Sequence, residues 1–338
     1  MAKATIKDVA REAGVGLGTA SRALTSSGPI SSDTRERVLA AARRLDYHPN
    51  SQAQSLRSAR TQTVGLLIPD VRNPFFAELA HSFEQESLAG GFTTFLGNAN
   101  EDTVQQNRYL DSLRSHRVDG LALAPQGGAT EAIEALLEDG VPAVFVDRTV
   151  EGITIPSVTS DPRPGIHQVA EHLSGLGHRR VGYISGPQQV SSGRERLRAW
   201  EDAVAEFRLD ADPRLVLHGD FQQTSGEIAA VELIERGATA LFAADSPMAL
   251  GALDACQARH LRIGHDIDLV GFDDLRLFRL LDPSLTTVSQ DVAGMGRIAA
   301  QLLQRVIAGE SPEPVRLPTR LVTRSSTHPL ASETGATA

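Results

Sequence analysis

Two side chains near the N-terminus could read the edges of DNA bases. Arg22 can donate two parallel hydrogen bonds to the O6 and N7 atoms of guanine, and Leu17 can contact the methyl group of thymine. Short polar side chains nearby can bond to phosphate oxygens, which fixes the register of a protein on a duplex but carries no sequence information: Thr5, Thr19, Ser21 and Asn50. The same residues could also be ordinary solvated surface positions, so the elements that hold them decide between the two interpretations.

Two short helices are predicted to position these residues. Thr5 and Asp8 have the spacing of a capping box, with Asp in place of the usual Glu or Gln, and open a first helix that Gly14 ends. The inward face of this helix is apolar: Ile6, Val9, Ala10 and Ala13. The second helix turns Ala20, Ala23 and Leu24 inward, which leaves an outer face of Leu17, Gly18, Ser21 and Arg22. A helix, a glycine turn and a second helix form a helix-turn-helix, in which early positions of the second helix reach base edges.

A third helix and a hinge are predicted to follow. The third helix begins near Ser32 and Asp33 and shows apolar residues at helical spacing: Val38, Leu39, Ala42 and Leu45. Pro49 stops it, and Asn50 can cap a further short helix that contains Ala53 and runs through Leu56. So short a helix is marginal in isolation, and we expect it to order only on DNA or across a dimer. An exposed Leu56 would then be a candidate wedge for the minor groove.

The charge of the chain is divided unevenly along its length. Residues 1–60 hold ten Lys or Arg and five Asp or Glu residues, a net charge of +5, whereas the remainder carries −14 and the whole chain −9. This division indicates a polyanion-binding module joined to a body that does not bind polyanions. The single cysteine, Cys256, excludes an internal disulfide and a cysteine-cluster metal site, and its apolar neighbours predict a buried, inert thiol.

The body has the pattern of a doubly wound α/β protein. Apolar runs predict strands, several of them near-continuous as in parallel strands covered on both faces: residues 64–68, 121–124, 143–146, 181–184, 240–243 and 269–272. Amphipathic segments such as residues 77–89 and 104–114 alternate with them, which indicates α/β architecture. Two such units are predicted, split near residues 159–162, with further crossings near residues 287–290 and 318–323.

Candidate ligand-binding residues follow several of these strands, because ligands of open α/β sheets bind at the carboxyl ends of strands. The rule selects residues 69–76 and 147–148 in the first unit, and residues 191–196, 244–245 and 273–274 in the second. Carboxylates and guanidinium groups bond vicinal hydroxyls, while Phe75 and Phe221 offer flat apolar faces, so the chemistry fits a small, neutral, hydroxylated molecule. We expect Phe76 to pack in the core and Asp274 to be structural. Residues 177–180 predict a turn into a strand rather than a phosphate site.

On these residues the chain resembles the LacI/GalR family of transcription repressors, from residue 4 through the hinge and on to about residue 328. The resemblance implies two Rossmann-like lobes joined by three crossovers, similar to periplasmic sugar-binding proteins. It also implies a division into a helix-turn-helix domain (1–46), a hinge (47–60) and an effector-binding core (61–330), followed by a disordered tail (331–338). The first lobe is expected at about 61–160 and 290–320, and the second at about 161–289 and 321–330.

The resemblance also implies roles for individual residues. In the head, base reading falls to Leu17, Gly18 and Arg22 and minor-groove insertion to Leu56, and the DNA-binding set as a whole is Thr5, Gly16, Leu17, Gly18, Thr19, Ser21, Arg22, Asn50, Ala53 and Leu56. In the body, the effector-binding set is Phe75, Asp147, Arg148, Asp161, Ser192, Arg196, Phe221 and Asp273. Arg196 could instead form a structural ion pair. The chain departs from the family at Gly16, Gly18, Ala20 and Ala244, which leaves base specificity and effector identity open.

The predicted function is a ligand-responsive transcription regulator, acting as a repressor. One short recognition helix reads few base pairs, so we expect a homodimer on a pseudo-palindromic operator. A tail of residues 331–338 is too short for a tetramer-forming heptad helix. The alternatives are a transport-type sugar-binding protein, which needs a signal peptide that the sequence does not show, and an α/β enzyme, whose usual motifs are missing from the sequence. We expect no catalytic residue, cofactor or metal, no membrane association, and a cytoplasmic location.

Overall fold

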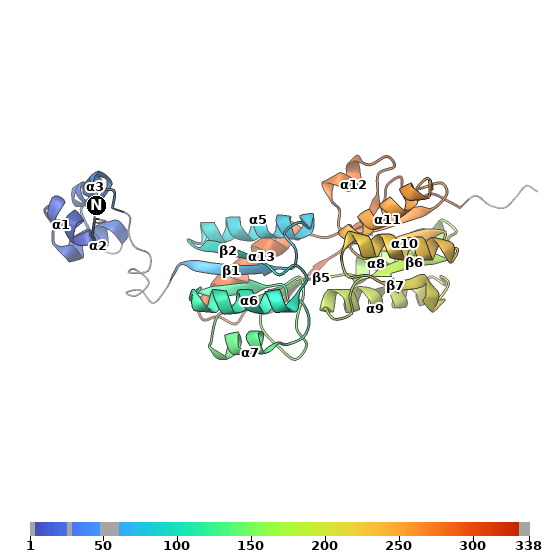
Figure 1. The fold of residues 1–338 in the computed structure, drawn as a ribbon, viewed down its shortest axis with the longest axis horizontal. Coiled ribbons are helices and arrows are strands. Elements are labelled where there is room, and N and C mark those ends of the chain that lie inside the picture. The colour runs from blue at the N-terminus through green and yellow to red at the C-terminus, as the bar shows by residue number, and fades with distance from the viewer. Residues whose placement is uncertain (1–3, 26–28, 48–60, 331–338) are drawn as a thin grey trace, which may run out of the picture. The chain divides into compact units, whose positions relative to one another are not determined.

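The computed structural model describes residues 4–25, 29–47 and 61–330. The chain divides into two compact units, which we call the head (Met1–Thr61) and the body (Gln62–Ala338) (Figure 1). The predicted hinge residues Asn50, Ala53 and Leu56 and the tail at 331–338 lie outside the described residues.

The head contains the three predicted helices, α1 (Ile6–Glu12), α2 (Leu17–Thr25) and α3 (Ser32–Arg44). The Asp8 carboxylate caps α1, because Oδ2 accepts hydrogen bonds from the Thr5 backbone N (3.0 Å) and from the Thr5 hydroxyl (2.7 Å). Gly14 has a φ of +64°, a left-handed conformation that glycine adopts without steric cost and that ends α1. The helix-turn-helix prediction is confirmed.

The core of the head is made mainly of small side chains. Its buried members are Val9, Ala10, Ala13, Ala20, Ala23, Val38, Ala41 and Ala42, with Val15, Leu24, Ile30, Leu45 and Tyr47 packed partly buried around them. Leu39, which the spacing placed inward, is only half-buried and lies outside this cluster. The inward stripe of α3 contains Ala41 instead, because Val38, Ala41, Ala42 and Leu45 repeat every three or four residues and share one face.

The body contains two six-stranded sheets of the same design. The first has the order β11-β5-β4-β3-β1-β2 and the second β12-β10-β9-β8-β6-β7. The strands of the first are β1 (Thr63–Ile68), β2 (Thr93–Asn98), β3 (Gly120–Leu123), β4 (Ala143–Val146), β5 (Ser157–Asp161) and β11 (Val315–Pro318). Those of the second are β6 (Val181–Ser185), β7 (Val216–His218), β8 (Ala240–Ala243), β9 (Asp268–Phe272), β10 (Thr286–Ser289) and β12 (Arg320–Val322). Every pairing is parallel except β10 with β12. Because the two strand orders are the same, β1 to β5 of the first sheet correspond in order to β6 to β10 of the second.

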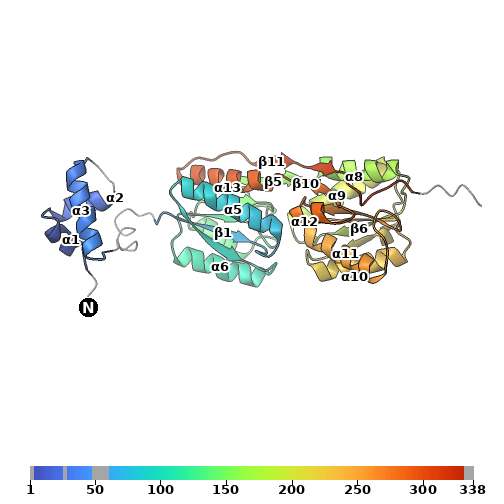
Figure 2. The same ribbon diagram turned by 90° about the horizontal axis from the view of Figure 1, so that it is seen from above.

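Helices cover both faces of each sheet (Figures 1 and 2). On the first sheet, α5 (Pro74–Ala89) and α13 (Val292–Ile307) bury one face, and α6 (Thr103–Ser115) and α7 (Glu131–Glu138) bury the other. On the second, α8 (Arg163–Gly175) packs beside α9 (Ser191–Glu206), and α10 (Gln223–Glu235) packs beside α11 (Ser246–Ala258). The short α12 (Arg276–Leu280) and a 3-10 turn, η1 (Pro213–Leu215), complete the second lobe. This arrangement confirms the doubly wound α/β prediction.

The chain passes between the two sheets three times. It leaves the first sheet after β5, returns from β10 to α13, and crosses again between β11 and β12. Thr319 lies in the last crossing, where its hydroxyl donates to the carbonyl of Asp161 (2.8 Å) and accepts from the Gly165 amide (3.0 Å). Two of the crossings are therefore tied to each other by hydrogen bonds.

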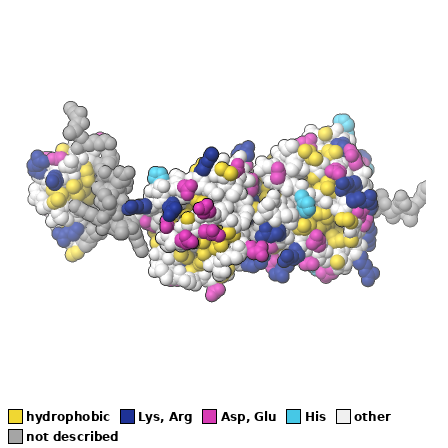
Figure 3. Space-filling model, turned by 60° about the horizontal axis from the view of Figure 1, so that its bottom comes forward, with side chains coloured by type: hydrophobic (Ala, Val, Ile, Leu, Met, Phe, Trp, Pro, Cys, Tyr) yellow, Lys and Arg dark blue, Asp and Glu magenta, His cyan; other side chains and the backbone are white. Residues whose placement is uncertain are grey.

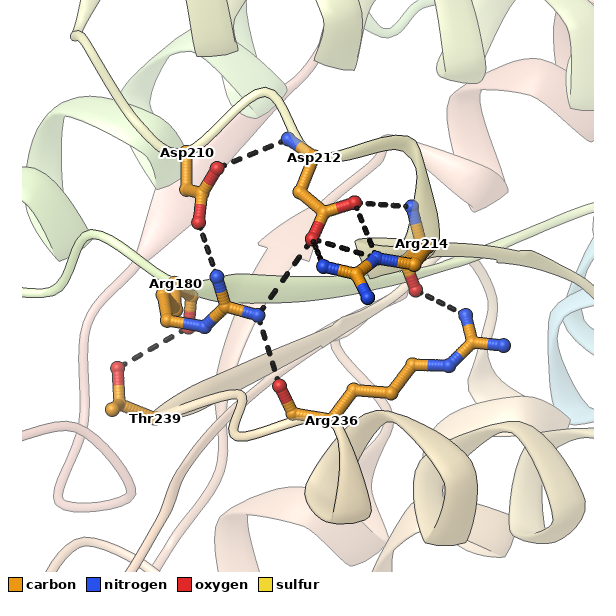
Figure 4. Close-up of polar contacts among 6 residues, drawn as sticks. All are labelled: Arg180, Asp210, Asp212, Arg214, Arg236 and Thr239. Carbon is orange, nitrogen blue, oxygen red and sulfur yellow. Dashed lines mark hydrogen bonds and ion pairs between the residues drawn. The ribbon is translucent and has the colours of Figure 1, made fainter.

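The edge of the second sheet where its strands begin is held by a network of ion pairs (Figure 4). Arg180, directly before β6, bonds to the Asp210 carboxylate and to the carbonyl of Arg236 (2.9 Å). Arg214 makes a bidentate pair with Asp212 at 2.7–3.1 Å, and these hydrogen bonds lower the pKa of Asp212 to about 2. The polar groups at this edge satisfy one another, which fits the predicted structural role of the segment at 177–180. Within the described residues, the helices are too short or too polar to cross a membrane.

Two helices of the second lobe approach so closely that glycine is required between them. A Cβ atom on Gly251 of α11 would collide with the backbone of Gln223 and Glu227 in α10. We expect Gly251→Ala to lower the free energy of unfolding of the body by about 1–3 kcal/mol, as for overpacked cores, which denaturant titration will measure. Gly175→Ala, at the end of α8 where a Cβ meets open space, is the control and should be neutral or stabilising by up to about 1 kcal/mol. Equal effects of the two substitutions would contradict the close packing.

Candidate functional site

The outer face of α2 presents the residues predicted to read DNA. Leu17 is 38% exposed, Gly18 and Arg22 are exposed, and Thr19 and Ser21 are half-buried. The Gly16 carbonyl accepts the amides of Thr19 (2.9 Å) and Ala20 (3.0 Å) and so begins the helix. Arg22 Nε donates to the carbonyl of Gly18 (3.3 Å), one turn earlier, so the guanidinium lies along the first turn of α2. The face therefore combines one apolar and one bidentate cationic group within six residues of α2.

Thr5 has a different environment from the one that the sequence indicated. Its hydroxyl and its backbone N–H both donate to Asp8, and these hydrogen bonds, the side-chain one first, lower the pKa of the Asp8 carboxyl. A phosphate oxygen that accepted from the Thr5 hydroxyl would have to replace Asp8 as the acceptor. Asn50, Ala53 and Leu56 remain predictions, because they lie outside the described residues.

A pocket in the body lies where strands of both sheets end. Its cavity volume, about 20 Å³, is far below the roughly 300–1,000 Å³ of common small-molecule sites and leaves room for about one water molecule. The lining comes from both lobes and consists of Asn73, Phe75, Phe76, Glu101, Asp147, Arg148, Ser192, Arg196, Phe221, Asp245 and Asp273. Seven of the eight predicted effector residues are brought together here, the exception being Asp161. Hydrogen bonds also cross between the lobes nearby, from the Thr149 amide to Ser191 Oγ (2.8 Å) and from Ser246 Oγ to Asn73 Oδ1 (3.4 Å).

Several lining residues have a backbone conformation that L-amino acids rarely adopt. Asp147 and Asp273, which follow the corresponding strands β4 and β9, have φ angles of 63° and 69°, and Glu101 and Phe221 have 52° and 64°. At Asp147 the chain makes a three-residue turn, since Arg148 N donates to the Val146 carbonyl (2.7 Å), and such turns around a left-handed centre are rare and strained. Strain of this kind persists where the surrounding structure over-determines it, as at ligand sites.

The two arginines of the pocket are already engaged. Arg148 is 2% exposed and makes a bidentate pair with Glu101, at 2.7 and 2.8 Å, while its Nε is buried and has no hydrogen-bond partner. Arg196 donates from Nη1 to the carbonyl of Ala244 (2.6 Å), and its guanidinium carbon lies 4.0 Å from the centroid of the Phe272 ring. Arg196 therefore contacts a carbonyl and a ring rather than forming the structural ion pair that the sequence left open.

Burial shapes the ionisation of the pocket carboxyls. Removal from water raises the pKa of Asp147 to about 6 and that of Asp245 to about 8, and it also raises the pKa of Asp273. The Arg148 and Arg196 charges oppose the shift at Asp147, whereas the Met248 amide opposes it at Asp245, whose Oδ1 caps α11 (2.9 Å). Asp273 Oδ1 accepts from Gln290 Nε2 (2.6 Å). Although Arg148 Nε lies 3.6 Å from Asp147 Oδ2, burial has the larger effect on the pKa of these carboxyls.

Asp161, predicted as an effector ligand, does not line the pocket. Its carboxylate pairs with Arg163, at 3.0 Å to Nε and 2.9 Å to Nη2, and these hydrogen bonds lower its pKa. Asp161 is the last residue of β5, where the chain leaves the first sheet, so it belongs to the first crossing between the sheets. Phe76, expected only in the core, is buried there and also borders the pocket, stacked edge-to-face on Phe75.

Three further lining residues were missing from the predicted effector set. Asn73 and Asp245 lie in the strand-end segments that the sequence selected, where each caps the following helix. Glu101 follows β2, a strand with mostly exposed or half-buried side chains and so without the apolar run that marks the others. An Asn100-Glu101 pair after such a strand carries little signal, and only the fold places Glu101 against Arg148.

Comparisons with known proteins agree with this architecture. Residues 5–50 match the family described as bacterial regulatory proteins, lacI family, and residues 170–327 match the periplasmic binding protein-like domain. The chain is 34% identical over 327 residues to the ribose operon repressor of Halalkalibacterium halodurans, which covers 96% of this chain and 97% of that protein. The chain belongs to the lacI family of bacterial regulatory proteins.

Two solved structures show similar folds over nearly the full chain. The lac repressor dimer bound to operator and an anti-inducer matches with a TM-score of 0.84 and 27% identity, covering 97% of this chain and 100% of that one. A complex of the transcriptional regulator CelR with cellobiose matches with a TM-score of 0.73 and 33% identity, covering 96% and 99%.

The raised pKa of Asp245 predicts a pH-dependent stability. Because the folded protein binds this proton more tightly than the unfolded chain, the stabilisation is complete below about pH 4 and is lost as the pH rises through about 8. Asp245→Asn keeps an oxygen for the Met248 amide and removes the charge. It should stabilise the body against unfolding by more than about 1 kcal/mol at pH 8, and by less at pH 5, in thermal melts.

Asp212→Asn is the control for this substitution. The pKa of Asp212 lies near 2, so this variant should have the same effect at pH 5 and at pH 8. An Asp245→Asn effect that did not change between the two pH values would contradict a protonated Asp245.

Proposed function

We propose that this protein is a transcription regulator of the repressor type. It binds a pseudo-palindromic DNA operator as a homodimer, and a small hydroxylated metabolite bound in the body pocket changes its affinity for DNA. The observation that carries the proposal is that one chain combines an exposed face of Leu17 and Arg22 on a helix-turn-helix with a pocket built from two lobes.

The head supplies the DNA contacts. The outer face of α2 fits the major groove, with Arg22 donating to a guanine and Leu17 meeting a thymine methyl group. Thr19 and Ser21 reach phosphate oxygens beside it, and the predicted hinge residues Asn50, Ala53 and Leu56, outside the described residues, are proposed to add further DNA contacts, with Leu56 in the minor groove. The net charge of +5 on residues 1–60 adds affinity that does not depend on base sequence and that falls with salt.

The body supplies the dimer contact and the control. Large apolar side chains are exposed on the edge strand of the first sheet and on a short helix of the second lobe: Phe95 and Leu96 on β2, and Leu277 and Leu280 on α12. Burying them between two copies would bring two heads to one operator. On the face of the body drawn in Figure 3, side chains of both signs are present, so this face does not offer DNA a surface of positive charge alone.

Effector control follows from the position of the pocket. Its lining comes from both lobes, so a ligand that bonds to Asp147 and Asp273 favours one angle between them. A ligand shifts the equilibrium between two lobe angles only if it binds the protein more tightly at one angle than at the other. The factor by which the ligand changes the affinity for DNA is then the factor by which DNA changes the affinity for the ligand. A transport-type sugar-binding protein would also have such a pocket, but that function leaves the helix-turn-helix without a role.

The proposed base reading predicts that Arg22→Ala weakens specific DNA binding. Loss of a bidentate contact to guanine costs about 1–3 kcal/mol, so operator affinity should fall roughly 10- to 100-fold and selectivity at one base pair should relax. The operator is first selected from random duplexes, and affinity is then measured by fluorescence anisotropy. Arg37→Ala, an exposed head arginine on α3 paired with Asp33, is the matched control and should cost much less. Equal losses would show that Arg22 contributes charge only.

The proposed control predicts that Arg196→Lys uncouples ligand from DNA. Lysine keeps the charge but lacks the planar fork that bonds to Ala244 and lies on Phe272. Operator affinity without ligand should stay within about threefold, whereas the ligand-induced change should largely disappear. Arg198→Ala, an exposed position on the same helix, is the control and should respond normally. A full response in Arg196→Lys would remove Arg196 from the site.

A further inference from the structure

Two larger cavities adjoin the pocket, and residues of both lobes line each of them. Their volumes are about 330 and 510 Å³, within the roughly 300–1,000 Å³ of common small-molecule sites, whereas the pocket has room for about one water molecule. The two cavities share three lining residues, Arg72, Glu101 and Gln222, and we call them together the outer cleft. The outer cleft can therefore hold a sugar-sized group with the lobes as they stand.

Glu101 and Phe221 lie at the boundary between the pocket and the outer cleft. Glu101 lines the pocket and both cavities, and Phe221 lines the pocket and the smaller cavity. Each is the third residue after its strand, β2 or β7, and these strands correspond in the two sheets. Phe221 is 6% exposed, and its ring centroid lies 5.2 Å from the guanidinium carbon of Arg148. A ligand that extends from the pocket into the outer cleft passes these two residues.

The charged side chains of the outer cleft already have partners or face water. Arg72 makes a bidentate pair with Asp70, at 3.0 and 2.7 Å, and Glu101 is held by the pair with the pocket arginine described above. Asp220 is exposed and accepts the backbone amide of Gln222 (3.0 Å). A ligand therefore needs no charge to bind in the outer cleft.

The free groups of the outer cleft are neutral and polar. Gln222 is the N-cap residue of α10 and is half-buried, yet its side chain does not cap the helix. Within the described residues, the side chains of Gln222, Gln189 and Thr224 make no hydrogen bond, and all three line the outer cleft. A carboxamide both donates and accepts, as does a hydroxyl, so these groups match the hydroxyls of a sugar. Val190 and Leu250 add apolar surface for its C–H groups.

We propose that the effector is a neutral disaccharide or related glycoside, with one unit bonded in the pocket once the lobes part and the second held in the outer cleft against Gln222. This inference rests on the proposed function and adds the size of the ligand to it. A free monosaccharide in the pocket leaves the outer cleft to water, whereas the second unit of a disaccharide satisfies the free amides and covers the apolar surface beside them.

Calorimetry on the full-length protein with matched sugars tests this inference. The probes are glucose and galactose, and four disaccharides built from them: cellobiose, maltose, lactose and melibiose. At least one disaccharide should bind more tightly than each of its component monosaccharides by about tenfold or more, because the second unit adds the equivalent of one or two net hydrogen bonds.

Variants of Gln222 locate the second unit. Gln222→Ala removes the free amide, so the preference for the disaccharide should fall by about fivefold or more. Gln222→Trp puts an indole in the space of the second unit, so disaccharide binding should be lost while any monosaccharide binding persists. Gln257→Ala, exposed on α11 and outside the outer cleft, is the matched control and should keep the full preference. Thermal melts of each variant check that it folds.

Three results would overturn the inference. A monosaccharide may bind as tightly as every disaccharide that contains it, none of the four disaccharides may bind, or both folded Gln222 variants may keep the full preference. Each would show that the second unit makes no contact in the outer cleft.

Operator binding by the same preparation separates this inference from the proposed function. Release or capture of DNA by a monosaccharide, with the disaccharides inert, would leave the proposed function standing and overturn this inference. Tight disaccharide binding by a protein that binds no duplex at low ionic strength would do the reverse.

Discussion

The carboxyl ends of the parallel strands are the constraint on which the body depends. Helices cover the faces of both sheets but cannot cover the strand ends, so polar residues there must bond to one another, to water or to a ligand. Because the two sheets have the same strand order, β4 and β9 occupy corresponding positions, and each is followed by an aspartate with a left-handed backbone, Asp147 and Asp273. Both aspartates line the same pocket.

Burial of these strand ends sets the chemistry of the pocket. The Glu101–Arg148 pair is stable there because both terminal nitrogens of the arginine are used, which offsets part of the cost of removing two charges from water. The aspartates have no bidentate partner of this kind, Asp147 lying 3.6 Å from Arg148 Nε, and burial raises the pKa of all three. At the opposite edge of the second sheet, hydrogen bonds from Arg214 lower the pKa of Asp212 instead. The pKa of an aspartate is thus raised where burial is the largest effect and lowered where hydrogen bonds from an arginine are.

The head meets a different constraint, because three short helices enclose little volume. Its core is built mainly from alanine, with Val9 and Val38 as the larger buried side chains, so the helices can pack closely and leave the outer face of α2 to other contacts. Leu17 and Arg22 are exposed on that face for the same reason. The two units therefore use different kinds of side chain: the head has exposed side chains for DNA, and the body has buried ones for a small molecule.

The sequence by itself determined the elements and most of the site, because these depend on local patterns. Continuous apolar runs marked β1, β3, β4, β6, β8 and β9, the Thr5–Asp8 spacing marked α1, and the strand-end rule found Asp147, Arg148 and Asp273. Only the tertiary structure decided which strand ends meet. Asp161 ends a strand at a crossing and pairs with Arg163, whereas Glu101, which follows a strand with little buried surface, reaches Arg148 forty-seven positions away. Contacts between distant segments, and the burial that shifts a pKa, arise from packing that no local pattern records.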